Sequence, residues 1–341
     1  TEPPIVPKAP SKPRVALIGT GGTISSIAVD SLDVLDYPDV SRKMKPAEIL
    51  DRTPELARFA DIVPINFREV GSTAIGPADW LELLKLIHAT EAQDGGFDGY
   101  VILHGTSTLE ETAYFLNLTL KIKPTVVLVG AQRPPSAVSS EGPVNLLAAV
   151  RTAIDSKTRG LGVLVVLNDE IQAAREVTKV STYRVNTFRT PDFGVLGQVD
   201  GDQVVMYRHP LRKHTLDTIF DVAGLSVLPR VDIAYAYAGA DDVAIEAYVA
   251  AGALGLVSAG LPPGIPPPLQ SAAFERAVSR GIVVVQASRG GAGRVARRKY
   301  LRDQHIVASD NLNAQKCRIL LMLALTVTQD PEVVQSYFDL Y

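Results

Sequence analysis

Short apolar runs alternate with amphipathic segments over the first part of the chain. The runs cover residues 15–18, 63–67, 101–103, 126–129 and 163–167, and helical spacing of apolar side chains marks 77–90, 109–120 and 143–154. Strands buried on both faces are continuously apolar, and in parallel sheets they alternate with helices. The pattern therefore predicts an α/β domain with a parallel sheet covered on both faces. Shorter, glycine-containing runs over 186–205 predict a hairpin that closes this domain.

The second part of the chain repeats the alternation on a smaller scale. Strands are expected at 233–237, 255–258 and 282–285, and helices near 243–252, 270–280, 313–327 and 331–340. We therefore predict a larger N-terminal α/β domain over 14–207, a linker over 208–229, and a smaller C-terminal α/β domain over 230–341.

Two segments show no hydrophobic period. Residues 25–46 are rich in Ser, Asp and Pro and predict a mobile loop with one aromatic residue, Tyr37. Residues 1–13 are proline-rich and lack an apolar core, so we interpret them as a flexible lead-in and not as a signal peptide, although a cleaved signal would leave no trace.

Thr1 after a removed initiator methionine suits a cytoplasmic protein. The cytoplasm is therefore favoured, and the periplasm stays open if a signal peptide has been removed.

One strand–helix unit carries two adjacent hydroxyl groups. The apolar run at 101–103 ends at His104 and Gly105, and a helical stripe begins at Leu109. Thr108 and Glu111 have the spacing of a capping box, which predicts the helix start. Thr106 and Ser107 should then lie at the carboxyl end of a strand and the positive end of a helix dipole, where open α/β sheets bind ligands.

Composition and charge narrow the function classes. The 341 residues are 46% hydrophobic and 21% charged, with no apolar run that could span a bilayer. A net charge of −3 gives no general attraction to nucleic acid or to anionic membranes, so neither is expected as a partner. Cys317 is the one cysteine, which excludes an internal disulfide framework. The five histidines lack the spacing of paired metal ligands, so no catalytic metal is expected.

A glycine-rich turn over 19–23 follows the first apolar run. A dinucleotide fingerprint would need a third glycine where the chain has Ile24, and no Walker lysine follows. From this segment alone, a purely structural turn and a functional Thr23 are both open. Thr23 becomes a candidate functional residue because a second hydroxyl cluster, Thr106 and Ser107, follows another strand.

Two further features allow a plain and a functional interpretation. Lys179 is either a solvated surface residue or, if it folds over the same sheet edge, a base whose pKa is lowered by burial. The basic run over 294–302 is typical of a solvated helix face. Nucleic-acid binding is disfavoured because Tyr300 is the one interleaved aromatic residue, and recruitment of an anionic substrate stays open.

Three sequence strings together resemble the bacterial type II L-asparaginase and glutaminase-asparaginase family. They are residues 20–24 (TGGTI), 104–113 (HGTSTLEETA) and 177–179 (VTK), and the resemblance runs from about residue 14 to the C-terminus with the motifs in the family's order. It implies a two-domain fold, with a larger flavodoxin-like parallel-sheet domain and a smaller C-terminal α/β domain. It also implies a homotetramer, a dimer of dimers with sites at the subunit interface, and no cofactor.

The resemblance also implies roles for individual residues. Thr23 matches the family's nucleophile, Tyr37 is the match to the lid tyrosine that assists it, and Thr106 and Lys179 match the proton-handling hydroxyl and lysine. The residues matched to substrate binding are Ser72, Thr73, Gly105, Ser107, Ala131, Arg297 and Arg298. A threonine hydroxyl needs a neighbouring base to act as a nucleophile, and backbone N–H groups at a helix start can stabilise the resulting oxyanion.

The chain departs from the family pattern on one side of the expected pocket. Ser107 stands where the family has aspartate, Thr73 where it has glutamine, and Gly239 where it has asparagine. Residues 294–299 hold no acid where a neighbouring subunit is expected to contribute one. In the family these groups contact the α-ammonium end of the amino acid. Loss of a carboxylate partner for a desolvated cation costs about 3–5 kcal/mol.

We therefore expect an amidohydrolase that releases ammonia from a small amide and handles free L-asparagine poorly. The expected substrate lacks a free α-ammonium group, being N-blocked, deaminated or cyclic, and an added anionic group would meet Arg297 or Arg298. An ordinary L-asparaginase or glutaminase that tolerates Ser107 is the alternative. A catalytically silent ligand-binding homologue is the third reading, against which the retention of Thr23, Thr106 and Lys179 argues.

Overall fold

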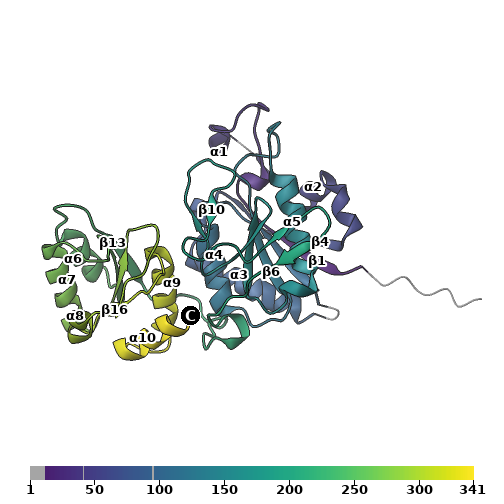
Figure 1. The fold of residues 1–341 in the computed structure, drawn as a ribbon. Helices are drawn as coiled ribbons and strands as arrows, with labels where there is room; N and C mark the ends of the chain where they lie inside the picture. Colours follow the sequence, from purple (N-terminus) through teal and green to yellow (C-terminus); the bar gives the residue numbers. More distant parts are fainter. Residues whose placement is uncertain (1–11, 41, 94–95) are drawn as a thin grey trace, which may run out of the picture.

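The structure, a computed structural model, places the chain in two α/β domains joined side by side (Figure 1). It describes residues 12–40, 42–93 and 96–341, so nearly all of the predicted lead-in lies outside the described residues. Each domain is built on its own sheet, and α9 (Ala314–Ala324) and the C-terminus lie at the junction between the two. Among the described residues, every helix is too short or too polar to traverse a bilayer.

The large domain contains an eight-stranded mixed sheet in the order β12-β11-β8-β7-β6-β5-β1-β4. Its parallel strands are β1 (Arg14–Gly21), β4 (Asp61–Val70), β5 (Gly99–Leu103), β6 (Thr125–Val129) and β7 (Val163–Leu167). The antiparallel edge comprises β8 (Glu170–Ala173), β11 (Gly197–Val199) and β12 (Val204–Met206). The two-domain α/β prediction is confirmed, and the expected hairpin is β11–β12.

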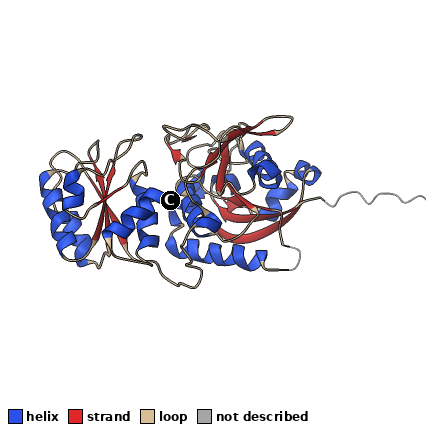
Figure 2. Ribbon diagram, turned by 60° about the horizontal axis from the view of Figure 1, so that its bottom comes forward, coloured by secondary structure: helices blue, strands red, loops and turns tan. Residues whose placement is uncertain are grey.

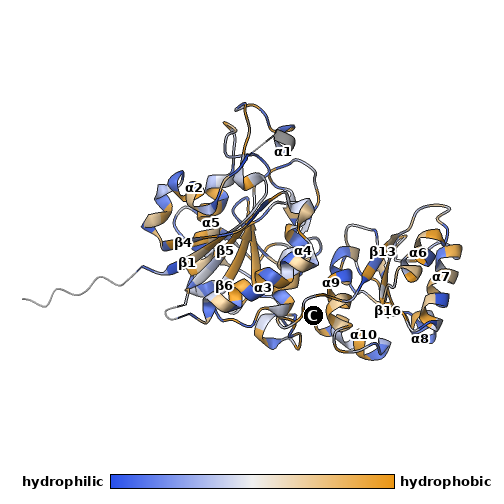
Figure 3. Ribbon diagram, turned by 180° about the vertical axis from the view of Figure 1, so that it is seen from behind, coloured by the Kyte–Doolittle hydropathy of each residue, from blue (hydrophilic) through white to orange (hydrophobic). Residues whose placement is uncertain are grey.

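Helices cover both faces of the large sheet (Figure 2). On one face lie α3 (Pro77–Glu91) and α4 (Leu109–Thr119), and on the other α2 (Pro46–Asp51) and α5 (Gly142–Ile154), as their shares in two separate core clusters show. The central strands are apolar and enclosed between these layers (Figure 3). The sheet is therefore packed on both faces, and its strand ends carry the loops that follow them.

The small domain has an all-parallel sheet in the order β13-β14-β15-β16. The strands are β13 (Val231–Tyr235), β14 (Gly255–Gly260), β15 (Val283–Ser288) and β16 (Val307–Ala308). On one face lie α6 (Val243–Ala250), α7 (Pro268–Ser279) and α8 (Lys299–Asp303), and on the other α9 and α10 (Pro331–Leu340). The core cluster that contains α9 also contains α3 and α4, so it continues from one domain into the other.

Two local predictions need correction. The segment 25–46 is not a loop throughout, because it forms β2 (Ser26–Ile27), α1 (Tyr37–Val40) and β3 (Arg42–Lys43) before α2 begins. Thr108 does precede α4, but no capping box forms. Its hydroxyl instead donates to the carbonyl of Ser72 at 2.8 Å, a tertiary partner that the local spacing does not reveal. The remaining short elements include β9 (Thr178–Lys179) and β10 (Phe188–Arg189), which pair with each other.

Candidate active site

Thr23 lies in a 3-10 turn directly after β1, at the carboxyl edge of the large sheet. Gly22, which precedes it, has a φ of 77°, and a Cβ on it would lie 2.3 Å from the Cα of Gly105. The turn after β1 and the loop after β5 therefore touch backbone to backbone, and a side chain at Gly22 would separate them. This contact holds Thr23 next to the loop that carries Thr106.

The hydroxyl of Thr23 lies 2.6 Å from the phenol oxygen of Tyr37, which begins α1. Burial raises the pKa of Tyr37, and the nearby carboxylates of Glu141 and Asp33 raise it further, against the lowering effect of the Thr23 hydrogen bond. The phenol is therefore protonated at neutral pH. It can relay a proton to or from Thr23, but it is not a ready base by itself.

A second hydroxyl, that of Thr106, forms a closed triangle with two other side chains. Nζ of Lys179 donates to Thr106 Oγ1 at 2.7 Å and to Gln132 Oε1 at 3.2 Å, and Thr106 Oγ1 donates to the same Gln132 oxygen at 2.8 Å. Thr106 comes from the loop after β5, Lys179 from β9, and Gln132 from the loop after β6. The structure thus brings Lys179 over the same sheet edge as the two threonines.

Burial lowers the pKa of Lys179, and the carboxylate of Glu110 partly offsets this effect. A lowered pKa increases the fraction of neutral amine near pH 7, which is the form that accepts a proton. The site thus combines a hydroxyl beside a protonated phenol with a hydroxyl beside an amine that is easier to deprotonate than an ordinary lysine.

His104 stabilises the loop after β5, which carries Thr106. Its Nδ1 lies 2.8 Å from the carbonyl of Gly105, and because a carbonyl only accepts, Nδ1 carries the proton. Nε2 then accepts from the hydroxyl of Thr112 at 2.9 Å, and Thr112 accepts from the indole of Trp80 at 2.9 Å. Burial lowers the pKa of His104 to about 4, so the imidazole is neutral and its role is structural.

The residues predicted to bind substrate fall into several environments. Ser72 is buried, and its hydroxyl accepts from the backbone N–H of Ser107 at 3.2 Å. Gly105 packs against Ser72, where a Cβ would come within 2.6 Å of the Ser72 hydroxyl. Ser107 and Thr73 are exposed, whereas Ala131 is fully buried. Only Ser107 and Thr73 of these five therefore present an open surface in the single chain.

Arg297 and Arg298 lie in the small domain, and among the described residues their side chains contact residues of that domain. Arg297 forms an ion pair with Glu332 on α10 at 2.6 Å, and Arg298 stacks on the ring of Tyr300 with a 5.1 Å separation. The structure does not bring them to the threonines of their own chain. Their predicted role, in the site of a neighbouring subunit, stays a prediction.

Three polar residues at the site were not predicted as functional. Gln132 binds both Thr106 and Lys179, Glu110 binds the backbone N–H of Lys179 at 2.6 Å, and Glu141 accepts from the backbone N–H of Gln132. Gln132 follows the apolar run of β6, and polar residues at the ends of neighbouring parallel strands were the available signal. Within the described ranges, no group of three or more His, Cys, Asp or Glu residues is arranged to hold a metal ion.

Comparisons with known proteins cover almost the whole chain. A family model for the N-terminal domain of asparaginase matches residues 14–212, and one for the glutaminase/asparaginase C-terminal domain matches residues 230–338. A probable periplasmic L-asparaginase of Haemophilus influenzae is 41% identical over 98% of this chain and 95% of its own. L-asparaginase 2 of Bacillus subtilis is 40% identical over 96% of this chain and 87% of its own.

A solved structure agrees with this relationship. The crystal structure of a probable cytoplasmic L-asparaginase from Campylobacter jejuni superposes with a TM-score of 0.92 at 38% identity, and covers 97% of this chain and 100% of its own. The relatives are thus named for different compartments, and the compartment of this chain stays a prediction. At this identity and coverage, the chain belongs to the asparaginase family of amidohydrolases.

Proposed function

We propose that this chain hydrolyses a small carboxamide through a covalent intermediate on Thr23. Thr23 Oγ1 attacks the amide carbon, the C–N bond breaks and ammonia leaves, and water then hydrolyses the ester to a carboxylate and restores the hydroxyl. The observation that carries the proposal is the pair of hydroxyl groups at adjacent strand ends, Thr23 at 2.6 Å from Tyr37 and Thr106 at 2.7 Å from Lys179.

The two pairs have different tasks in this proposal. Tyr37, protonated at neutral pH, takes the proton of Thr23 as it passes its own to the amide nitrogen, which leaves as ammonia, so the phenol never needs to be a free phenolate. In the second step, neutral Lys179 accepts through Thr106 the proton of the water that attacks the ester, and this proton is returned to the Thr23 oxygen when the ester breaks. General acid–base groups placed in this way typically contribute about 10²–10⁴-fold.

The proposed substrate is an amide without a free α-ammonium group. L-asparaginase and glutaminase-asparaginase are the names of the relatives, which supports a carboxamide of the size of an asparagine or glutamine side chain. Ser107 is exposed beside Thr106 and carries no charge, so this position offers no carboxylate to an ammonium group. The names of the relatives fit an ordinary asparaginase equally well, and that activity is the alternative outcome of the test.

The test compares three proteins on three amides. Ammonia release is measured for the unchanged protein, Thr23→Ala and Ser107→Asp with L-asparagine, L-glutamine and succinamate, which is asparagine without its amino group. We expect the unchanged protein to favour succinamate. Ser107→Asp should raise kcat/KM for L-asparagine by about 10²–10³-fold, the worth of a carboxylate partner, without a gain on succinamate.

Each part of the proposal has its own contrary result. Higher kcat/KM for L-asparagine than for succinamate in the unchanged protein, with no gain from Ser107→Asp, identifies an ordinary asparaginase. Undiminished ammonia release by Thr23→Ala would overturn the covalent step. Binding of these amides by the unchanged protein without any ammonia release identifies a silent homologue.

We also propose that the chain assembles as a homotetramer in which a neighbour's small domain borders each site. Within the described part of the chain, the side chains of Arg297 and Arg298, matched to substrate binding, contact small-domain residues. Light scattering should give a mass four times that of the chain. A monomer with full activity would contradict this assembly.

A further inference from the structure

The segment that carries Lys179 is attached to the small domain by a buried lysine. Lys316 on α9 is 1% exposed, and its Nζ donates to the carbonyls of Ala174 at 2.9 Å, Arg175 at 3.0 Å and Val177. These three carbonyls belong to the stretch that runs directly into β9 and Lys179. All three donors of one ammonium group therefore bind one loop of the other domain.

A buried carboxylate attaches the same segment from the opposite direction. Glu110 in the first turn of α4 is 4% exposed, and it accepts from the backbone N–H of Lys179 at 2.6 Å and from the hydroxyl of Thr178 at 3.0 Å. It also accepts from the side chains of Gln315 at 2.7 Å and Asn313 at 3.2 Å, at the start of α9. Glu110 thus joins α4, β9 and the small domain.

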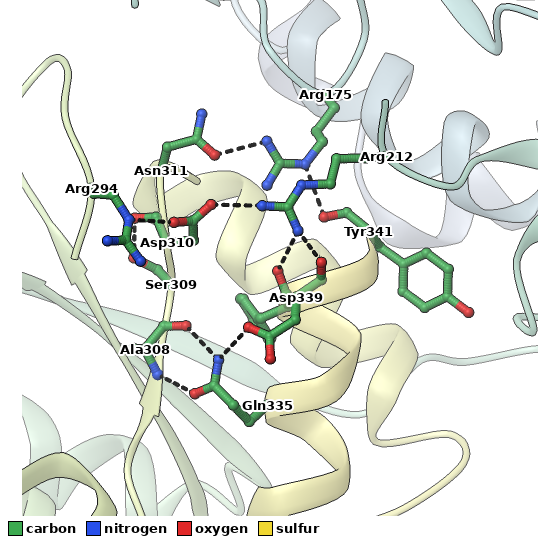
Figure 4. Close-up of polar contacts among 11 residues, drawn as sticks. Arg175, Arg212, Arg294, Ala308, Ser309, Asp310, Asn311, Gln335, Asp339 and Tyr341 are labelled. Carbon is green, nitrogen blue, oxygen red and sulfur yellow. Dashed lines mark hydrogen bonds and ion pairs between the residues drawn. The ribbon is translucent and has the colours of Figure 1, made fainter. Parts of the chain in front are cut away.

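Arg175 supplies a third attachment at the junction (Figure 4). Its Nε donates to the backbone carbonyl of Tyr341 at 2.8 Å, and one terminal nitrogen donates to Asn311 at 2.8 Å. In the same cluster Arg212 forms an ion pair with Asp310 at 2.8 Å. Residues 174–179 therefore bind the small domain both through the Arg175 side chain and through their backbone carbonyls.

These contacts are costly to build and specific in geometry. Transfer of an ammonium ion or a carboxylate out of water costs several kcal/mol unless its hydrogen bonds are replaced. Burial lowers the pKa of Lys316 to about 8, against the opposing influence of Glu110. A packed apolar side chain would avoid this cost, but it would leave the carbonyls of the Lys179 segment without their donors.

We propose that Lys316 and Glu110 are positioning residues, through which the small domain sets the place of Lys179 Nζ against Thr106. The proposal rests on the proposed function for the reaction itself, since it concerns the geometry of the base in that reaction. Among the described residues, neither side chain hydrogen-bonds to the hydroxyl of Thr23 or Thr106. Lys316 acts through residues 174–177, whereas Glu110 acts through the Lys179 backbone and through its charge on the Lys179 amine.

The first test compares Lys316→Met with Arg318→Met. Arg318 lies on the same helix and donates to the carbonyl of Val231 within the small domain, so its loss removes a cation from α9 without touching the Lys179 segment. A misplacement of about 1 Å typically costs about 10²-fold in rate. We expect kcat to fall by about 10²-fold in Lys316→Met with KM changed less than about twofold, and kcat to stay unchanged in Arg318→Met.

The second test reads Lys179 itself, in a form independent of any substrate. Acylation of Lys179 over a pH series, followed by peptide mass spectrometry, gives the midpoint at which its amine becomes reactive. Glu110 is the charged group that acts on Lys179, while Thr106 and Gln132, its other neighbours, are uncharged. Loss of this negative charge destabilises the protonated amine, so Glu110→Gln should shift the midpoint to lower pH.

The outcomes separate this inference from the proposed function. A lower midpoint in Glu110→Gln supports the positioning role even if the protein hydrolyses no amide. The labelling of Lys179 needs no turnover, and it can be carried out equally in Thr23→Ala. The inference is overturned if the midpoint is unchanged in Glu110→Gln. It is also overturned if Lys316→Met keeps the kcat of the unchanged protein and loses only thermal stability, to the same extent as Arg318→Met.

Discussion

Tyr37 is the residue on which the reactivity of Thr23 depends most directly in this account. Tyr37→Phe keeps the ring and removes the oxygen that lies 2.6 Å from Thr23 Oγ1. We expect kcat to fall by about 10²–10⁴-fold, the usual range for one acid–base group, with the thermal midpoint little changed. Steady-state ammonia release measures it. A variant as fast as the unchanged protein would exclude Tyr37 from proton transfer.

His104 should make folding stability depend on pH. Its pKa is about 4 in the folded chain against 6.5 for a free histidine, so between these values the unfolded chain binds a proton that the folded chain does not. As pH falls from 6.5 to 4, the free energy of unfolding should drop by up to about 3 kcal/mol from this group.

Urea unfolding at a series of pH values tests this dependence. His104→Gln should lose this component of the pH dependence, whereas substitution of the exposed His209 by glutamine should leave it intact. If the pH dependence of His104→Gln matches that of the unchanged protein, the conclusion that His104 is neutral in the folded chain is wrong.

At the scale of elements, the contact between the turn after β1 and the loop after β5 decides the site geometry. Gly22→Ala places a methyl group 2.3 Å from the Cα of Gly105, so we expect the two loops to separate and activity to be lost. Gly160 is a matched control, because it has a similar φ of 73° but nothing within 4 Å of the added Cβ. Gly160→Ala should cost only the conformational strain of about 1–2 kcal/mol and keep full activity.

Both variants are compared by ammonia release and by thermal unfolding. Equal activities in Gly22→Ala and Gly160→Ala would show that the loop contact does not hold Thr23 in place.

The elements themselves show which parts of the fold a sequence can predict. The buried strands β5, β6 and β7 were predicted because burial on both faces makes them continuously apolar. The strand β8 was missed because its first residue, Glu170, is polar. Asn168 and Asp169, which precede it, both have positive φ and form the two-residue turn of the β7–β8 hairpin. The Asn-Asp pair was the available signal for this hairpin.

The candidate site divides in the same way. The nearness of Thr23 and Thr106 was predictable, because parallel strands end at one edge of a sheet. The role of Glu110 depends on which side chains the tertiary fold brings opposite it, and no spacing along the chain encodes that, whereas the position of Gln132 after β6 was an available signal. For the same reason the Thr108 hydroxyl was assigned to a capping box when it donates to Ser72.

At the scale of the whole molecule, the C-terminal residue joins the two domains. Tyr341 is 2% exposed; its ring centroid lies 5.1 Å from that of Phe220 and 6.0 Å from that of Tyr337, and its backbone carbonyl accepts from Arg175. Tyr341→Ala should lower the free energy of unfolding by about 3–5 kcal/mol, the usual cost of deleting a buried aromatic ring.

Chemical unfolding of Tyr341→Ala and Leu340→Ala measures this contribution. Leu340 is 40% exposed, so its truncation should cost little. Similar losses in both variants would mean that the aromatic cluster does not stabilise the junction.

The central claim, that Thr23 carries the acyl group, is tested most directly by trapping the intermediate. The protein is mixed with the amide that it hydrolyses fastest, quenched in acid within milliseconds, digested and examined by mass spectrometry. The account predicts an acyl adduct on the peptide that contains Thr23, and no adduct on that peptide in Thr23→Ala. An adduct on Thr106 with Thr23 unmodified would contradict it.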